Sequence, residues 1–173
     1  SILKDEFKNN PNAHAILFHE RIEEVMNLYN RLLKKGISVV AENGKLSEDI
    51  RATSVELFRH GVAKVIVSAK ALIEGINVPS ADIGIIVAAN NSVRQRIQAL
   101  GRVLRKTQVE GKEKKAIVYV LYMAGTTDEY IYEKTDWNKI IGVSRNRYFS
   151  WDLKNGAKEL EGPPRNPRRF EDS

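Results

Sequence analysis

The chain has 173 residues, of which 42% are apolar and 29% are charged, as in an ordinary folded domain with one core. It contains no cysteine and three scattered histidines, which argues against a disulfide framework and against a metal site. No apolar run approaches membrane-spanning length, and no leader pattern is visible. We therefore expect an intracellular protein of the cytoplasm (nucleoid) or the nucleus, without a membrane partner.

The net charge of +6 comes from one part of the chain. Residues 1–93 contain eleven cations and eleven anions, residues 94–115 contain eight and two, and residues 116–173 contain nine and nine. A positive field this focused suits phosphate, either of a nucleotide or of a nucleic-acid backbone. The alternative is a solvated helix face followed by a basic loop.

The chain begins with an expected helix, strand and second helix. A charged helix carrying KDEF precedes the apolar run 13–18, which predicts a strand. Apolar side chains in residues 22–33 then follow helical spacing up to Gly36, which predicts a helix that ends there.

A second strand and helix are expected next. Residues 37–41 favour a strand, and the pair Asn43-Gly44 marks the turn that follows it. Ser47 is a candidate N-cap for a helix that ends near Gly61.

Apolar runs continue in the second half of the chain. Three of them predict strands: residues 64–69, 81–88 and 116–123. Thr126 or Thr127 is expected to cap a further helix that runs to about Ile141. Because the predicted strands are apolar runs rather than alternating ones, both of their faces must be buried. The fold class is therefore α/β: a doubly wound, mostly parallel sheet flanked by helices.

The last thirty residues differ in composition from the rest. Aromatic residues, an Asn155-Gly156 turn and a second short run predict a hairpin packed on the domain edge. The Pro- and Arg-rich end lacks apolar periodicity and predicts a mobile tail. We expect three parts: a main domain over residues 1–142, the hairpin over 143–161 and the tail over 162–173.

Ligands of such a sheet bind at the carboxyl ends of its strands, so the loops that follow the strands are candidate sites. The loop after the third strand begins at Ser68, which can donate to a phosphate oxygen, and contains Gly75, which allows close backbone approach. The NNSVRQ loop after the next strand is polar and initiates a helix, and Gly44 follows the second strand. Each signal is weak alone, but three on one sheet edge favour phosphate binding.

Four segments in order resemble the motifs called IV, IVa, V and VI of the second RecA-like domain of superfamily-2 helicases: AILFHERIEEV, NGKLSEDIRATSVELFRHG, VIVSAKALIEGINVPSADIGII and SVRQRIQALGRVLR. The residues of the last two motifs are most similar to those of the XPB-like DNA helicase branch. The resemblance covers about residues 13–105, and the strand and helix up to Ile141 also fit. It implies a RecA-like fold and an ATP-dependent motor acting on nucleic acid, DNA rather than RNA.

The resemblance implies that motif VI supplies two arginine fingers, which match Arg102 and Arg105 here. In the family these reach the γ-phosphate of ATP with Mg²⁺, which is held mainly by a separate N-terminal RecA-like domain. A spacing of three puts both arginines on one helix face, and a guanidinium suits phosphoryl transfer because its charge and donor geometry are fixed. Gln98 matches the leading glutamine of the motif on the ATP side, and Gly101 the small residue that permits close helix packing.

The chain departs from the family pattern at two positions. Ala99 stands where an arginine usually follows the glutamine, so the contact that the family makes there is not supplied by this residue. Asn77 stands where motif V usually has an acid; it can still hydrogen-bond a ribose hydroxyl or a motif VI arginine, without the charge.

The resemblance further points to six nucleic-acid contacts: His19, Arg21, Gly44, Lys45, Ser68 and Lys70. These would hold the sugar-phosphate backbone of one strand, so we expect little sequence preference and a steep salt dependence. Simpler alternatives are that Lys70 is only solvated, that His19 only caps, and that nearby Arg51 only pairs with Glu48 or Glu56 on its own helix.

The chain has no G-x-x-x-x-G-K-S/T loop and no strand-borne Asp-Glu pair, so it lacks the elements that hold ATP for hydrolysis. We therefore predict half of a two-domain helicase motor that is inactive alone. The alternatives are a non-catalytic nucleic-acid or protein-binding module on the same fold, the motor domain of a restriction or remodelling complex, or an RNA helicase.

Overall fold

The computed structural model describes residues 2–69, 81–87, 104, 107–109, 112–114, 117–123, 125–126, 128 and 147–162. The chain divides into two compact units, Ser1–Tyr122 and Met123–Ser173, which are described separately below. The predicted limit at residue 142 and all but the first residue of the predicted tail (162–173) lie outside the described residues, so the three-part division stays a prediction.

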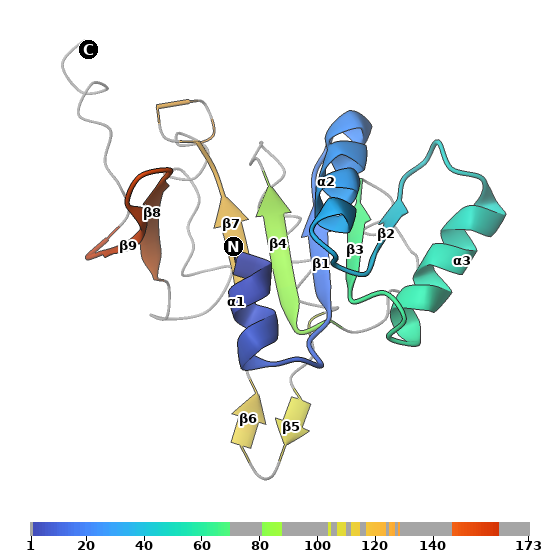
Figure 1. Ribbon diagram of the computed structural model, residues 1–173, viewed down its shortest axis with the longest axis horizontal. Helices are drawn as coiled ribbons and strands as arrows, with labels where there is room; N and C mark the ends of the chain where they lie inside the picture. Colours follow the sequence, from blue (N-terminus) through green and yellow to red (C-terminus); the bar gives the residue numbers. More distant parts are fainter. Residues whose placement is uncertain are drawn as a thin grey trace. The chain divides into compact units, whose positions relative to one another are not determined.

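The first unit is built on a five-stranded sheet in which every neighbouring pair is parallel (Figure 1). In chain order its strands are β1 (Ala15–Phe18), β2 (Val39–Glu42), β3 (Val65–Ser68), β4 (Ile83–Val87) and β7 (Ile117–Leu121). Their order across the sheet is β2-β3-β1-β4-β7. The predicted parallel sheet flanked by helices is therefore confirmed.

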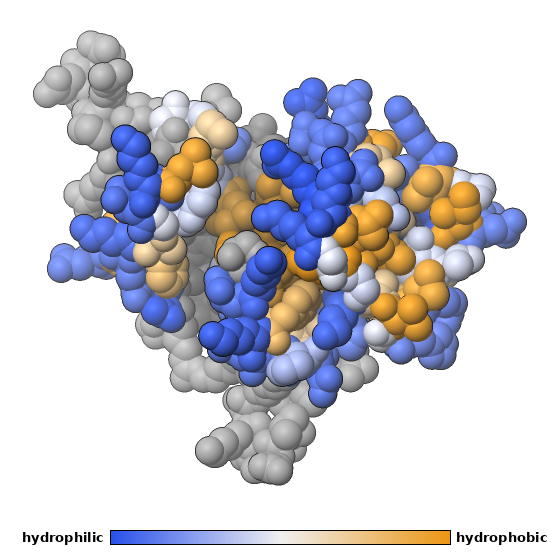
Figure 2. Space-filling model, viewed as in Figure 1, coloured by the Kyte–Doolittle hydropathy of each residue, from blue (hydrophilic) through white to orange (hydrophobic). Residues whose placement is uncertain are grey.

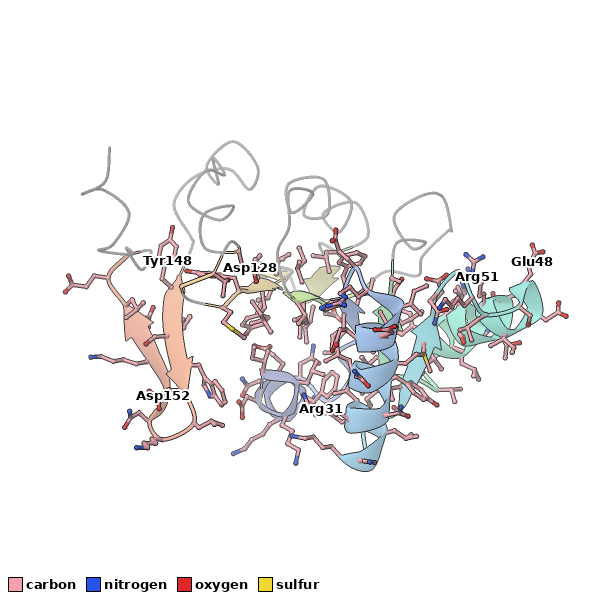
Figure 3. The ribbon with its side chains drawn as sticks, turned by 90° about the horizontal axis from the view of Figure 1, so that it is seen from above. Arg31, Glu48, Arg51, Asp128, Tyr148 and Asp152 are labelled. Atoms are coloured by element: carbon pink, nitrogen blue, oxygen red, sulfur yellow. The ribbon has the colours of Figure 1, made fainter. Side chains whose placement is uncertain are left out.

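In the described part of the first unit, three helices accompany this sheet: α1 (Ile2–Asn9), α2 (Ile22–Lys34) and α3 (Glu48–Arg59). Figure 3, which looks down on the carboxyl ends of the strands, shows α1 and α2 on the same face of the sheet. Helix α3 packs against the edge strand β2 and its neighbour β3. In Figure 2, hydrophilic side chains cover the outer surfaces of α1 and α2, and apolar side chains show beside and between these helices.

Both faces of the central strands are buried, as their apolar sequences predict. On the face covered by α1 and α2, alternate residues of neighbouring strands form one core: Ala15, Leu17, Val65, Val67, Ile83 and Ile85. The intervening residues on the opposite face are equally buried: Ile16, Phe18, Ile66 and Ile86, all at most 2% exposed. Burial on both faces is what a parallel sheet requires, since its strands are joined by crossovers that pass over the faces.

The helix ends match the local signals in the sequence. The Ser47 hydroxyl accepts a hydrogen bond from the Ile50 amide at 3.4 Å, which confirms the predicted N-cap of α3. Gly61 follows α3 at φ +74° and Gly36 follows α2 at φ +72°, a left-handed conformation that glycine adopts without strain. Acidic residues lie in the first turn of both helices and basic residues in the last, which stabilises the helix dipoles.

Two antiparallel ribbons complete the described residues. In the first unit, β5 (Thr107–Val109) pairs with β6 (Lys112–Lys114), where the sequence predicted only a basic loop. In the second unit, β8 (Tyr148–Asp152) pairs with β9 (Gly156–Leu160), which confirms the predicted hairpin. Apart from the first turn, where the Thr126 hydroxyl accepts from the Asp128 amide at 3.3 Å, the helix predicted up to residue 141 lies outside the described residues.

Candidate nucleic-acid interface

Three neighbouring strands end side by side at one edge of the sheet. Glu42, the last residue of β2, is in register with Ser68 of β3, and Ser68 is in register with Phe18 of β1. Two hydrogen bonds continue this alignment past the strand ends: the His19 amide donates to the Ser68 carbonyl oxygen at 3.1 Å, and the Ala69 amide to that of Glu42 at 3.1 Å. We call residues 19–21, 42–46 and 68–69 together the carboxyl edge.

The centre of the carboxyl edge is the side chain of Glu42, which is completely buried. Its Oε1 accepts a hydrogen bond from Arg51 Nε at 2.9 Å, and its Oε2 accepts one from the Ser68 hydroxyl at 2.7 Å. Both oxygens of the carboxylate therefore have a donor. A buried charge is tolerated only when its partner and its hydrogen bonds are in place.

Arg51 reaches this carboxylate from the first turns of α3. Its side chain is 28% exposed, so the guanidinium closes the buried network on one side and borders solvent on the other. Figure 3 shows Arg51 on α3 at the β2 end of the sheet, with Glu48 farther out along the helix. The sequence suggested Glu48 or Glu56 as the partner of Arg51, whereas the structure brings Glu42 to it.

The turn after β2 is closed by Asn43, which is 1% exposed. Its Oδ1 accepts a hydrogen bond from the Lys45 amide at 3.0 Å, and its carbonyl oxygen accepts one from the Leu46 amide at 3.2 Å. An asparagine that bonds its own backbone two residues on is typical of a tight turn. Gly44 and Lys45 are consequently exposed at the tip. A Cβ added at Gly44 would meet nothing within 4 Å, so the space over this residue is open to a ligand.

The loop after β1 contains His19 and Arg21. His19 is 8% exposed, and its Nδ1 accepts a hydrogen bond from the Arg21 amide at 3.0 Å, so the ring bonds the residue just before α2; this bond does not decide between the capping alternative and a nucleic-acid contact. Burial lowers the pKa of His19, although the nearby Glu24 carboxylate opposes the shift. Because Nδ1 is an acceptor in this bond, the ring is neutral. Arg21 is exposed at the N-cap of α2.

Ser68 is placed at the edge, but its hydroxyl faces inward. The residue is fully buried, and its Oγ lies 2.7 Å from both Glu42 Oε2 and the Ala69 carbonyl oxygen. A phosphate contact through this hydroxyl would require its bond to Glu42 to break. The role of Ser68 in nucleic-acid binding stays a prediction, as do those of His19, Arg21, Gly44 and Lys45.

The remaining predicted site residues lie outside the described residues: Lys70, Gly75, Asn77, Gln98, Gly101, Arg102 and Arg105. Their neighbour Leu104 is described, and it forms a parallel bridge with Ala81, two residues before β4 begins. Within the described ranges, no group of three or more histidine, aspartate or glutamate side chains could hold a metal ion. No helix in the described part of the chain is long and apolar enough to cross a membrane.

Sequence reasoning missed Glu42 and the true partner of Arg51. A signal was present, because an acidic residue at the end of an otherwise apolar buried strand must find a cation or a donor nearby. That Ser68 is a partner of Glu42 could not be predicted from the sequence, since the two residues lie 26 positions apart and become neighbours only when β3 pairs with β2.

The parallel order β2-β3-β1-β4-β7 with polar loops at the carboxyl edge places the chain among RecA-like α/β domains. Among solved structures it is similar to the helicase domain of Hef from Pyrococcus furiosus, with a TM-score of 0.62 and 25% identity over 78% of this chain and 27% of that one. It is also similar to the E. coli DEAD-box protein SrmB, with a TM-score of 0.64 and 21% identity over 77% of this chain and 74% of that one. The likeness to SrmB shows the fold alone.

The family follows from the sequence comparison. Residues 1–107 match the model of the helicase conserved C-terminal domain, so the chain belongs to that family and is a second RecA-like domain of the superfamily-2 type. It is also 36% identical over 84 residues to the DNA 3'-5' translocase XPB2 of Sulfurisphaera tokodaii, which confirms the expected XPB-like character. The match covers 49% of this chain and 18% of that relative, so the chain spans about a fifth of the length of the translocase.

Proposed function

We propose that this chain is the C-terminal motor half of an ATP-dependent helicase or translocase that moves along DNA. The observation that carries the proposal is the carboxyl edge, where three motif-bearing loops begin side by side on β2, β3 and β1. A row of adjacent loops with exposed cations can follow successive phosphates of one strand.

Two exposed positions of this edge are suited to a phosphate-led contact. Lys45 and Gly44 lie at the tip of the turn after β2, with open space over the glycine. Arg21 adds a second exposed cation at the start of α2. Contacts of this kind hold the backbone without reading bases, so binding would be insensitive to sequence and would fall steeply with salt.

The catalytic part of the proposal rests on motif VI. Arg102 and Arg105 would act as arginine fingers toward ATP and Mg²⁺ bound by a separate N-terminal RecA-like domain, which is the expected partner. Gln98 and Gly101 would seat them, and Gly75 and Asn77 would line the same nucleotide from motif V. When bound, the nucleotide supplies the phosphoryl transfer that drives closure and opening of the two domains. We place DNA ahead of RNA because the 36% identical relative is described as a DNA translocase.

The test is a protein that joins this chain to its N-terminal RecA-like domain. Arg105→Ala should reduce DNA-stimulated ATP turnover by about a thousandfold or more, because an arginine finger stabilises the transition-state charge. Arg31→Ala, which removes an exposed arginine from α2, is the matched control and should leave turnover unchanged. Turnover of Arg105→Ala within a few-fold of the unmodified protein would refute the finger assignment. Clear ATPase activity of the 173-residue chain alone would refute the half-motor proposal.

A further inference from the structure

We propose that Glu42 is a positioning residue for the strand-binding function. Through Arg51 and Ser68 it holds the turn that carries Gly44 and Lys45 in its binding geometry. The inference rests on the proposed function, since it assigns a role to Glu42 within the edge that would bind nucleic acid. Glu42 itself is completely buried and would not touch the ligand.

Stability alone does not explain a carboxylate at this position. The three preceding residues of β2 are apolar, and an apolar residue would continue that pattern. Replacing a buried ion pair by well-packed apolar side chains is often neutral or stabilising, because the desolvation of two charges offsets their attraction. What a hydrogen-bonded carboxylate adds is direction: each oxygen fixes one donor at one place.

The bonds of Glu42 join β2 to α3 and to the end of β3 around the turn. Oε1 holds Arg51 of α3, Oε2 holds Ser68 at the end of β3, and the carbonyl oxygen accepts from the Ala69 amide. Glu42 and Arg51 also bracket the turn in sequence, with eight residues between them. The exposed tip at Lys45 therefore lies between Glu42 and Arg51, which the Glu42 carboxylate holds together.

A positioning role and a simple charge effect predict opposite signs. Glu42→Gln removes a negative charge beside an edge proposed to bind phosphate, so electrostatics alone predicts tighter binding. If Glu42 positions the turn, the same substitution weakens binding, because a neutral amide cannot replace both charge-assisted bonds. Glu56→Gln is the matched control: it removes the same charge from α3, but Glu56 is half-exposed and pairs with Arg59 on the helix surface.

The first measurement needs no ligand. Hydrogen exchange of the Lys45 and Leu46 amides, both held by Asn43, reports the order of the turn. In Glu42→Gln these amides should exchange about tenfold faster than in the unmodified chain, and in Glu56→Gln at the unmodified rate. Unchanged exchange in Glu42→Gln would overturn the proposal.

The second measurement is the affinity of the folded chain for a fluorescent oligo-dT single strand at fixed salt. Glu42→Gln should weaken binding by about three- to tenfold, the equivalent of one ordinary hydrogen bond, and Glu56→Gln should leave it unchanged or slightly tighter. A lowered melting temperature with unchanged or tighter binding would reduce Glu42 to a structural residue and overturn the proposal. If Glu42→Gln does not fold, Glu42→Asp keeps the charge but is too short to reach both donors, and it should give the same signs.

The two proposals fail in different ways. If the unmodified chain does not bind the oligonucleotide, the nucleic-acid-binding part of the proposed function is refuted. The exchange rates of Lys45 and Leu46 still decide whether Glu42 orders the turn. If the chain binds and Glu42→Gln binds equally well, the edge stands as a binding site and Glu42 is excluded as its positioning residue.

Discussion

Replacing Arg51 with methionine tests the energetics of the buried network at the carboxyl edge. The change keeps a long apolar stem on α3 and removes the donor that lies 2.9 Å from Glu42 Oε1. The Glu42 carboxylate then remains fully buried with the Ser68 hydroxyl as its one side-chain donor in the described structure. Removing one partner of a buried ion pair costs about 3–5 kcal/mol. Because the Arg51 side chain is 28% exposed, we expect a loss near the lower end, about 3 kcal/mol.

The assay is urea denaturation followed by far-UV circular dichroism, with thermal melting as a second measure. A loss of about 3 kcal/mol should lower the melting temperature by about 10 °C in a unit of this size. The double variant Glu42→Gln/Arg51→Met removes the orphaned charge, so its loss of stability should be smaller than the sum of the two single losses by at least about 1 kcal/mol. A loss below about 1 kcal/mol for Arg51→Met, as for a surface pair, would refute the buried-charge reasoning. Additive losses would refute it as well.

Three further predictions concern the same unit. Ser47→Ala should destabilise the chain by about 0.5–1 kcal/mol in urea denaturation, the lower range for an N-cap because its bond is long, and Ser47→Asp should not. Because the pKa of His19 is lowered in the folded chain, the imidazole takes up a proton at a higher pH in the unfolded chain than in the folded one. The free energy of unfolding should therefore fall as the pH drops below about 6.5. His19→Asn, which keeps an acceptor near Nδ1, should flatten that fall; an unchanged slope would contradict the assignment. Lys45→Ala should reduce the slope of log affinity for single-stranded DNA against log salt by about 0.7, whereas Lys35→Ala, beyond the end of α2, should not change it.

Local signals predicted most of the fold correctly. The apolar runs that became β1, β3, β4 and β7 were identified as strands, and the cap at Ser47 was predicted from its position before a helical pattern. Burial was predicted correctly for β1, β3 and β4, whereas Ile117 and Leu121 of the edge strand β7 are exposed. These features depend on residues within a few positions of one another, where hydrogen bonding and burial follow a fixed period. The β5–β6 ribbon escaped prediction because its short polar strands are joined within a run of charges, which reads equally well as a solvated loop.

The candidate site was predicted in outline. Gly44 and Ser68 were chosen because strand ends meet at one edge of a parallel sheet, and Lys45 was chosen from the motif resemblance. The structure places the ends of β2 and β3 in register, while the binding roles of these residues stay predictions. The inward direction of the Ser68 hydroxyl was not foreseen. A serine after a strand has the same sequence signature whether its hydroxyl faces a ligand or a buried carboxylate.

The sequence by itself determined the strands of the parallel sheet, the helices α2 and α3, the Ser47 cap, and the motifs that indicate a helicase C-terminal domain. Only the tertiary structure decided that β2 lies beside β3, and therefore that Glu42 meets Ser68 across the sheet and Arg51 from α3. The physical reason is that strand order is set by crossovers and by burial of the whole sheet, which no local pattern encodes. A charge at a strand end therefore acquires its partners, and with them its role, only when the sheet is assembled.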